Sequence, residues 1–375
     1  MRPVAELRIR ARFVHTPYRH WGAHSGYPKF IEHLDPARYR AEVHRAADNH
    51  EEIPLCLRPF RPWLRERLKR RAMKWYKVSD LNAELAAFGR CLAGRLDMVH
   101  FLDGEHSVQF LPRALDALGS RVLTVASFHQ PPDLLEELLD PAALRGLDHV
   151  VLMSPSQISY FERHLPAAKV SVILHGVDAD FFHPAPRRPR RSAPRCITVG
   201  HWLRDWSVVH AVADRLPGVE FHVVSPRETG LGGLANVILH PSVDDETLAE
   251  LYRQADLLFL PLLDSTANNS LLEGLASGLP TVTSDLAAVR AYVGGDEAIL
   301  APVSDASAAA AAVTRVLNDP LLHARMSAAA RARAETLAWR RVAARHEALY
   351  TRLVEHARLR APLRTSVREP RRIEL

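Results

Sequence analysis

The sequence is poor in cysteine and in long apolar runs, and both shortages narrow the class of protein. Among its 375 residues are only three cysteines, Cys56, Cys91 and Cys196, which lie far apart. An odd number of scattered cysteines argues against a disulfide framework and favours a reducing compartment. No uncharged apolar stretch reaches the roughly 18 residues that a membrane span needs, and the first residues lack the apolar region of a signal peptide. We therefore expect a cytoplasmic protein, with peripheral attachment to the inner face of the membrane left open.

Signature motifs of several enzyme classes are also missing. The sequence contains no Walker A loop, no HExxH pair and no CxxC pair. A P-loop phosphate site, a zinc-protease site and a dithiol site therefore have no local signature in this chain.

Lysine is scarce as well, at positions 29, 69, 74, 77 and 169 alone, so arginine supplies most of the formal net charge of +6. A mild positive excess fits a phosphate-bearing substrate or an anionic surface, and we predict no nucleic-acid partner.

Residues 58–77 concentrate nine cationic residues, interleaved with apolar ones such as Trp63 and Trp75. On a helix this segment would form a basic amphipathic surface for an anionic membrane or an acidic acceptor. A solvated helix with a few core anchors fits equally well.

Short apolar runs alternate with helical stretches from end to end, which is the rhythm of βαβ units in a parallel, doubly wound sheet. The rhythm occurs twice, on either side of residues 184–194, whose four prolines and four arginines are typical of an exposed linker. We therefore predict an α/β protein of two domains, 1–185 and 186–339, the first completed by 340–360. An Arg-rich tail, 361–375, is expected to be disordered. The predicted strands are 6–15, 41–47, 98–103, 122–129, 149–154, 170–175, 196–200, 220–225, 236–240, 256–261, 281–284 and 298–301.

Residues 264–280 follow one of these strands and carry the clearest chemistry. Their small polar loop lets a ligand approach the backbone, and the helix that follows would point its free N–H groups and positive dipole end at an anion such as a diphosphate. Glu273 lies one turn inside, where a carboxylate suits a pair of ribose hydroxyls. Ser270-x-x-Glu273 is also a capping box, and on this segment alone the capping interpretation is favoured.

This segment is similar to the donor-binding signature of the retaining glycosyltransferases of family 4, which have the GT-B fold. In that signature a strand ending in Pro and a loop precede two Glu residues and a run that ends in Gly-x-Pro; here it reads PLLDSTANNSLLEGLASGLP. The resemblance implies that Glu273 is the second Glu and binds the ribose. The first Glu, which contacts the transferred sugar, falls on Ser265, with Asp264 as a substitute if the loop is shifted by one. This departure implies an unusual donor sugar or a reassigned catalytic role.

Three more segments resemble the same family in the expected order, and an ordered set is more specific than any one match. They are 175–184 (HGVDADFFHP), 244–262 (DDETLAELYRQADLLFLPL) and 337–350 (LAWRRVAARHEALY). The resemblance implies two Rossmann-like domains facing a cleft, with a C-terminal helix that crosses back onto the first. We interpret Val177, Phe182 and Trp339 as packing residues.

The loop 199–206, VGHWLRDW, is the candidate for the diphosphate. The family usually has Arg and Lys where this chain has His201 and Trp206, so the resemblance leaves Arg204 as the best remaining cation. Arginine suits phosphate through its bidentate fork. The alternative is a surface Arg204 paired with Asp205 or another acid. We predict that Arg204 and His201 meet the donor together with groups at Asn268, Asn269, Ser270 and Leu271.

The first half offers His129, at the end of strand 122–129. The family commonly has a His here that faces the transferred sugar, and histidine can donate or accept a hydrogen bond near pH 7. The loop 21–26, WGAHSG, resembles the family's glycine loop, with Gly22, Ser25 and Gly26 as contacts to the donor phosphate or the acceptor; a simple turn is the alternative. Residues 103–106, DGEH, are a weaker acceptor-site candidate.

These features predict a retaining glycosyltransferase that moves a sugar from a nucleoside-diphosphate sugar to a hydroxyl of a glycan, a lipid-linked sugar or a small molecule, without a further cofactor. His129, Ser265 and Asp264 are the catalytic candidates. Asp178-Ala179-Asp180 has the spacing of a nucleotide-sugar metal site, but the GT-B resemblance implies metal-independent transfer, so we predict no metal. Three alternatives stay open: a nucleotide-sugar-binding protein without transferase activity, a GT-B epimerase, and a membrane-surface scaffold that uses 58–77.

Overall fold

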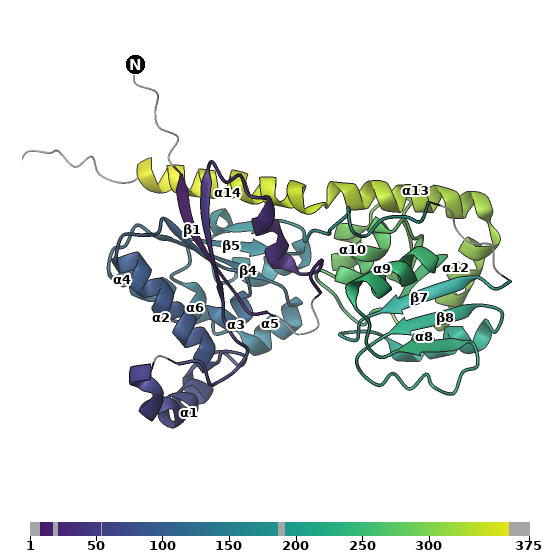
Figure 1. Cartoon of the computed structure of the whole chain (residues 1–375), viewed down its shortest axis with the longest axis horizontal. Helices are drawn as coiled ribbons and strands as arrows, with labels where there is room; N and C mark the ends of the chain where they lie inside the picture. Colours follow the sequence, from purple (N-terminus) through teal and green to yellow (C-terminus); the bar gives the residue numbers. More distant parts are fainter. Residues whose placement is uncertain (1–7, 18–21, 54, 187–191, 360–375) are drawn as a thin grey trace, which may run out of the picture.

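The structure, a computed structural model, describes residues 8–17, 22–53, 55–186 and 192–359. It has two lobes, and each contains a six-stranded parallel sheet with helices packed against it (Figure 1). The predicted α/β class with two doubly wound sheets is confirmed, and each predicted strand is present with ends shifted by a few residues.

The first lobe has the strand order β2-β1-β3-β4-β5-β6. Its strands are β1 (Ile9–His15), β2 (Tyr39–Arg45), β3 (Met98–Phe101), β4 (Leu123–Phe128), β5 (His149–Leu152) and β6 (Val170–Val172). Its α-helices are α1 (Arg61–Arg71), α2 (Val78–Leu92), α3 (Gly104–Ser107), α4 (Leu111–Ala117), α5 (Pro132–Leu138), α6 (Pro141–Leu144) and α7 (Ile158–Glu162), and its 3-10 helices are η1 (Tyr27–His33), η2 (Leu55–Phe60), η3 (Pro155–Gln157) and η4 (Ala167–Lys169).

The second lobe has the strand order β12-β11-β10-β7-β8-β9. Its strands are β7 (Arg195–Val199), β8 (Glu220–Val224), β9 (Val237–His240), β10 (Leu257–Leu260), β11 (Thr281–Ser284) and β12 (Ala298–Ala301). Its helices are α8 (Trp206–Arg215), α9 (Asp245–Gln254), α10 (Asn269–Ala276), α11 (Ala287–Tyr292), α12 (Ala306–Asn318) and α13 (Pro320–Thr336).

The order of the strands decides where a ligand can bind. In an open parallel sheet, ligands lie beyond the carboxyl ends of the strands where the direction of strand addition reverses. In the first lobe this point lies between β1 and β3, and in the second between β7 and β10. The central strands are apolar and buried on both faces, as in Phe101 and Leu260, so only the loops after them are free for chemistry.

The last helix, α14 (Trp339–Leu359), ties the two lobes together. It continues the line of α13 along one side of the molecule and lies over the first lobe (Figure 1). Its Trp339, Val342 and Tyr350 are buried in the same apolar cluster as Phe13 of β1. Backbone bonds join Val177 to Leu337 and Trp339 at the crossing point. The predicted packing role of Val177, Phe182 and Trp339 agrees with their burial, at 4%, 1% and 3% exposed.

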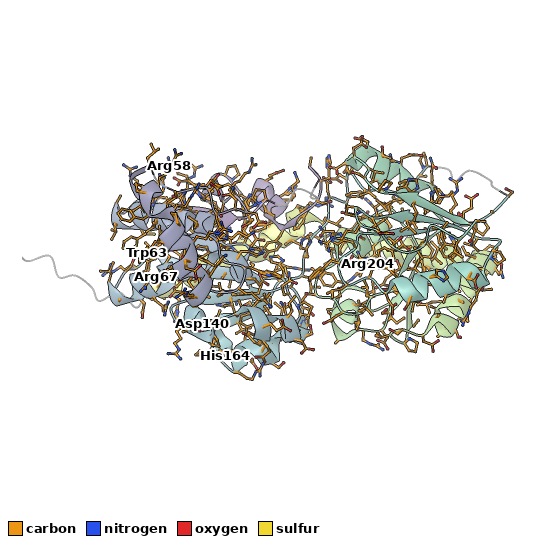
Figure 2. The ribbon with its side chains drawn as sticks, turned by 90° about the horizontal axis from the view of Figure 1, so that it is seen from below. Arg58, Trp63, Arg67, Asp140, His164 and Arg204 are labelled. Atoms are coloured by element: carbon orange, nitrogen blue, oxygen red, sulfur yellow. The ribbon has the colours of Figure 1, made fainter. Side chains whose placement is uncertain are left out.

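The basic segment 58–77 is less amphipathic than expected. Its helix, α1, projects from the first lobe and turns only Leu64 and Leu68 toward the core. Phe60 and Trp63 are 57% and 59% exposed, and the guanidinium of Arg67 lies 5.5 Å from the Trp63 ring centroid (Figure 2). Residues 58–70 are therefore mostly an exposed cationic surface with aromatic side chains on it, whereas Met73 and Tyr76 at the end of the segment are buried.

Some predictions fall outside the described residues: most of the linker at 187–191, Trp21 of the glycine loop, and the tail 361–375. Within the described ranges, no helix has the length and apolar character required to cross a membrane.

Candidate functional site

A cavity of about 1170 Å³ lies between the lobes and is lined by both. Most residues that the sequence singled out meet there, because the carboxyl ends of β4, β7 and β10 face the same space. The predicted site residues that line it are Gly22, His129, His201, Arg204, Asp264, Ser265, Asn268, Asn269, Ser270 and Glu273. Gly26 and Leu271 do not belong to this lining.

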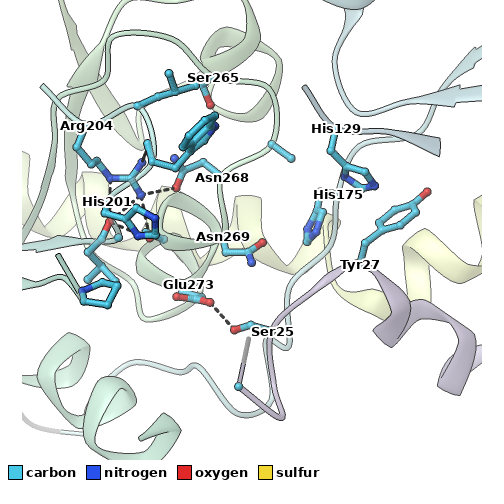
Figure 3. A pocket seen from close by; sticks show the side chains of 18 of the residues that line it. Ser25, Tyr27, His129, His175, His201, Arg204, Ser265, Asn268, Asn269 and Glu273 are labelled. Carbon is cyan, nitrogen blue, oxygen red and sulfur yellow. Dashed lines mark hydrogen bonds between the residues drawn. The ribbon is translucent and has the colours of Figure 1, made fainter. Parts of the chain in front are cut away.

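Glu273 is held on the cavity side of α10, only 5% exposed. The hydroxyl of Ser25, from the first lobe, donates to its Oε1 at 2.6 Å (Figure 3), and the hydroxyl of Tyr252 donates to its Oε2 at 3.0 Å. Burial raises the pKa of Glu273, and the two hydroxyl donors oppose that shift. The carboxylate therefore already accepts hydroxyl hydrogen bonds, the type of bond that a ribose would offer.

The start of α10 corrects the capping-box interpretation. The N-cap is Asn268, whose Oδ1 accepts from the N–H of Leu271 at 3.1 Å, and Ser270 is inside the helix. The Leu271 side chain is 1% exposed in the core and its N–H donates to Asn268, so the contact of Leu271 with a donor stays a prediction that the side chain does not support. The N–H groups of Asn269 and Ser270 donate to no atom within the described part of the chain, and these are the groups that remain for an anion.

Arg204 forms part of the cavity wall rather than a projecting cation. Its guanidinium donates to the carbonyl of Val199 at 2.7 and 2.9 Å, to that of Trp202 at 2.9 Å, and to Ser270 Oγ at 3.2 Å (Figure 3). Burial lowers its pKa to about 10, and the acid Glu273 opposes that shift. The alternative pairing with Asp205 is wrong, because Asp205 instead caps α8. Arg204 brings a buried positive charge to the base of α10, and its contact with a diphosphate stays a prediction.

The loop after β10 reaches across the cavity. Ser265 is 5% exposed, and its N–H donates to Asp264 Oδ1 at 2.7 Å. Burial raises the pKa of Asp264. The Thr266 hydroxyl donates to the backbone carbonyl of His129, so the loop of the second lobe is tethered to the first.

His129 occupies the opposite wall (Figure 3). Its Nε2 lies 2.7 Å from the carbonyl oxygen of Leu102, which can only accept, so Nε2 carries the proton and Nδ1 is left as an acceptor. Its ring meets the Tyr27 ring edge-on at 5.0 Å, and Glu105 accepts from its backbone N–H. The imidazole is therefore fixed in one orientation, and in its neutral form Nε2 holds the proton.

Two buried acids lie beside His129, in the segment that the sequence rated as the weaker candidate. Asp103 is 4% exposed and accepts from the N–H of Thr16 at 2.8 Å. Burial raises its pKa to about 6, and the charge of His129 opposes the shift. Glu105 is 2% exposed, and burial raises its pKa also. Buried acids at a cavity wall are typical of functional sites.

The glycine loop of the first lobe touches the second lobe. A Cβ at Gly22 would lie 1.6 Å from Asp245 Oδ1, so a larger residue here would require the Asp245 carboxylate to move. Gly26 has a φ of 101° and precedes η1, which makes it a turn residue, as the alternative interpretation held. The ring of His24 stacks on Phe181, with centroids 3.5 Å apart. The loop is therefore a direct contact between the two walls.

No group of three or more His, Cys, Asp or Glu side chains in the described ranges is placed to hold a metal ion. In the Asp178-Ala179-Asp180 motif, Asp178 accepts from His24 Nδ1 at 2.7 Å and from the N–H of Phe181 at 3.0 Å. Its carboxylate thus serves the junction between the lobes.

Sequence reasoning missed several cavity residues, because nothing local marks a side chain that becomes important through a distant partner. They are Tyr27, His175, Asp245 and Thr266 in the lining, with Tyr252 behind Glu273. Lys74, Trp75 and Lys77 also line the cavity, and they belong to the basic segment 58–77, which was predicted from the sequence as a candidate surface for a membrane or an acidic acceptor.

Comparisons with known proteins agree with this architecture. The family model described as "Glycosyl transferases group 1" matches residues 201–319, so the likeness of this part of the chain to glycosyltransferases is confirmed. The chain is 27% identical over 232 residues to the D-inositol 3-phosphate glycosyltransferase of Thermobispora bispora, covering 53% of this chain and 54% of that protein. It thus spans about half the length of that curated relative.

Solved structures support the fold. Sucrose-phosphate synthase from Thermosynechococcus elongatus superposes with a TM-score of 0.70 at 17% identity, covering 93% of this chain and 100% of the other. Anabaena Alr3699/HepE in complex with UDP gives a TM-score of 0.63 at 13% identity, covering 92% and 100%. The two lobes therefore have the GT-B fold, as predicted.

Proposed function

We propose, from the resemblance to the group 1 glycosyltransferases, that the chain transfers a sugar from a nucleoside-diphosphate sugar to an acceptor hydroxyl, with retention and without a metal ion or further cofactor. The observation that supports this most is the cavity shared by the lobes, where Glu273 and the start of α10 face His129 (Figure 3). Its volume of about 1170 Å³ exceeds that of ordinary single-ligand pockets, which suits a donor and an acceptor together.

In this proposal the donor lies along the second lobe. A ribose hydroxyl replaces Ser25 at Oε1 of Glu273, which is a bond of the same kind. The diphosphate accepts from the N–H groups of Asn269 and Ser270, and the buried charge of Arg204 adds a positive potential behind them. The sugar then points across the cavity toward His129 Nδ1, which can accept a hydrogen bond from a sugar hydroxyl. The structure of HepE holds UDP, which makes UDP the first donor nucleotide to test.

The proposed chemistry needs no protein nucleophile. The bond from the anomeric carbon to the β-phosphate oxygen breaks, and the acceptor oxygen bonds to that carbon on the same face. The acceptor proton passes to the leaving phosphate oxygen, so the products are the glycoside and the nucleoside diphosphate. The side chain at position 265 is a serine, which cannot supply a negative charge, so the departing phosphate itself balances the charge that develops on the sugar.

The same position supports a second candidate function. Without a carboxylate at Ser265, and with His201 and Trp206 where related proteins have cations, the chain would hold a nucleotide sugar and not transfer it. Transfer or hydrolysis of a donor by the purified protein separates the two functions.

We also propose that α1 brings the protein to an anionic membrane surface. Its Arg61, Arg65, Arg67, Lys69 and Arg70 are exposed together with Phe60 and Trp63, the combination that binds anionic headgroups and their interface. Equal sedimentation with neutral and with phosphatidylglycerol vesicles would contradict this contact.

The test of the main proposal is a thermal-shift screen against UDP, GDP, ADP and their sugars. A ligand that binds the native state raises the melting temperature by mass action. Absence of a shift with every nucleotide would refute donor binding. For a sugar nucleotide that is consumed, proton NMR of the product gives the anomeric configuration, and an inverted product would refute retention.

A further inference from the structure

The first-lobe half of the cavity has a cationic end that the donor does not use. Lys74, Trp75 and Lys77 line it, in the short segment between α1 and α2. This end belongs to the first lobe, whereas the groups proposed for the diphosphate lie at the start of α10 in the second.

Each of the two lysines forms an ion pair with a carboxylate that an anionic ligand can replace. Lys74 Nζ lies 3.4 Å from Glu137 Oε2, with side chains 61% and 65% exposed, and Lys77 Nζ contacts Asp48 Oδ1, with side chains 27% and 41% exposed. Exposed ion pairs of this kind contribute about 0–1 kcal/mol. A more highly charged anion in the cavity therefore displaces the carboxylates readily.

The positive charge at this end continues onto α1. Burial lowers the pKa of His50, and the charges of Arg65, Lys77 and Lys69 lower it further, so these three cations act on one point. Because Lys77 lines the cavity while Arg65 and Lys69 belong to the exposed helix, cationic side chains continue from the surface of α1 to the cavity wall, with Glu51 opposing their effect on His50.

Hydroxyl-binding groups lie between this end and the donor. The ring of His106 is 5.0 Å from that of Trp75, and Asp103, which also lines the cavity, is close enough to His129 for their charges to interact. A carboxylate accepts hydrogen bonds from hydroxyls, and an aromatic face packs against a sugar-like ring. The first-lobe wall of the cavity therefore combines a hydroxyl acceptor near His129 with an aromatic side chain and two cations.

We propose that this half of the cavity binds an acceptor that carries a phosphate group on a hydroxylated ring. Lys74 and Lys77 take the phosphate, Trp75 packs against the ring, and Asp103 orients the ring hydroxyls beside His129. The assignment rests on the proposed transferase function, since it names the second substrate of the same site. The phosphate belongs either to a soluble sugar phosphate or to the headgroup of a lipid delivered along α1.

The small number of lysines makes a direct test available. The chain has only five, at 29, 69, 74, 77 and 169, so acetylation followed by peptide mass spectrometry reports each one separately. The donor site is first filled with the nucleoside diphosphate that gives the largest thermal shift. Inorganic phosphate, glucose 6-phosphate and phosphatidylinositol vesicles are then added in separate arms, with glucose and phosphatidylcholine vesicles as uncharged controls.

We expect phosphate compounds to slow acetylation of Lys74 and Lys77 by about threefold at twice their Kd, the ratio set by occupancy, while Lys29 and Lys169 are unchanged. Protection by glucose 6-phosphate with Lys69 unchanged identifies a soluble acceptor. Protection by phosphatidylinositol vesicles that includes Lys69 identifies a lipid headgroup. Unchanged rates at Lys74 and Lys77 in all phosphate arms would overturn the proposal.

A charge variant gives an independent readout. Lys74→Gln combined with Lys77→Gln should abolish the thermal shift caused by the protecting compound. Arg163→Gln, which removes a similarly exposed ion pair with Glu136 outside the cavity, should retain it. An equal shift in both proteins also overturns the assignment. Failure of every nucleoside diphosphate to bind would refute the donor proposal instead, and lysine protection can still be measured without nucleotide.

Discussion

Replacing Ser25 with alanine should tighten the binding of a nucleoside diphosphate, whereas Glu273→Ala should weaken it. In the free protein the Ser25 hydroxyl occupies Glu273 Oε1 at 2.6 Å. In the proposed donor complex a ribose hydroxyl takes that place, so the donor must first displace the serine. Ser25→Ala removes the competitor and leaves the carboxylate for the ligand.

The size of the effect follows from the bond that is lost. A hydrogen bond to a charged group contributes about 1.5–3 kcal/mol, and Ser25 is partly exposed, so we take about 1.5 kcal/mol. The free Ser25→Ala protein loses this stabilisation and the nucleotide complex does not. The difference corresponds to roughly tenfold tighter binding. Glu273→Ala loses the ribose bonds themselves, and its affinity should fall by roughly tenfold or more.

Isothermal titration with the nucleoside diphosphate measures both affinities, and differential scanning fluorimetry measures the stability of the free variants. Ser207→Ala is the matched control, because Ser207 Oγ donates to Asp205 Oδ1 at 2.5 Å outside the cavity. It should lower stability without changing nucleotide affinity. If Ser25→Ala binds nucleotide as weakly as Glu273→Ala, Ser25 contacts the ligand directly and the displacement argument fails.

Three further outcomes are expected. Burial raises the pKa of Asp103 to about 6, above the value of about 3.9 in the unfolded chain, so its ionisation destabilises the native state increasingly from pH 4 to pH 6 and fully above pH 6; Asp103→Asn should gain roughly 3 kcal/mol at pH 8 and little below pH 4, as measured by urea unfolding. Burial lowers the pKa of His175 and of His346 to about 3, so below pH 6.5 only the unfolded chain takes up these protons, and each histidine lowers stability by about 1.4 kcal/mol from pH 7.5 to 5.5; replacing either one with glutamine should shift the stability change over this range by that amount, and an unchanged pH dependence would contradict this. A Cβ at Gly176 would lie 2.3 Å from the Trp339 ring, so Gly176→Ala should destabilise by about 1–3 kcal/mol, with part of the loss removed in combination with Trp339→Leu.

Local patterns in the sequence were sufficient to predict the two sheets and the location of the candidate site. Short apolar runs are typical of strands that helices cover on both faces, so the pattern of these runs along the sequence was sufficient to predict the strands. The segment around Glu273 was predicted correctly as the end of a strand followed by a helix facing the cavity.

What the sequence could not predict depends on contacts between distant residues. The bond from Ser25 to Glu273 joins positions 248 residues apart, and the bond from Thr266 to the His129 carbonyl joins positions 137 apart. The capping-box alternative is wrong for a similar reason: Ser270 Oγ donates to the carbonyl of Val199 instead. The spacing of residues along the sequence does not show which hydrogen-bond partner another strand will supply.

The crossing of α14 has a consequence for how the chain is made. The first lobe needs Trp339, Val342 and Tyr350 to complete the core that contains Phe13. A ribosome releases β1–β6 first, then the whole second sheet, and only afterwards α14. During synthesis the second lobe can therefore finish folding while one face of the first sheet still exposes apolar side chains to chaperones. The lobe that is translated first is the last to be completed.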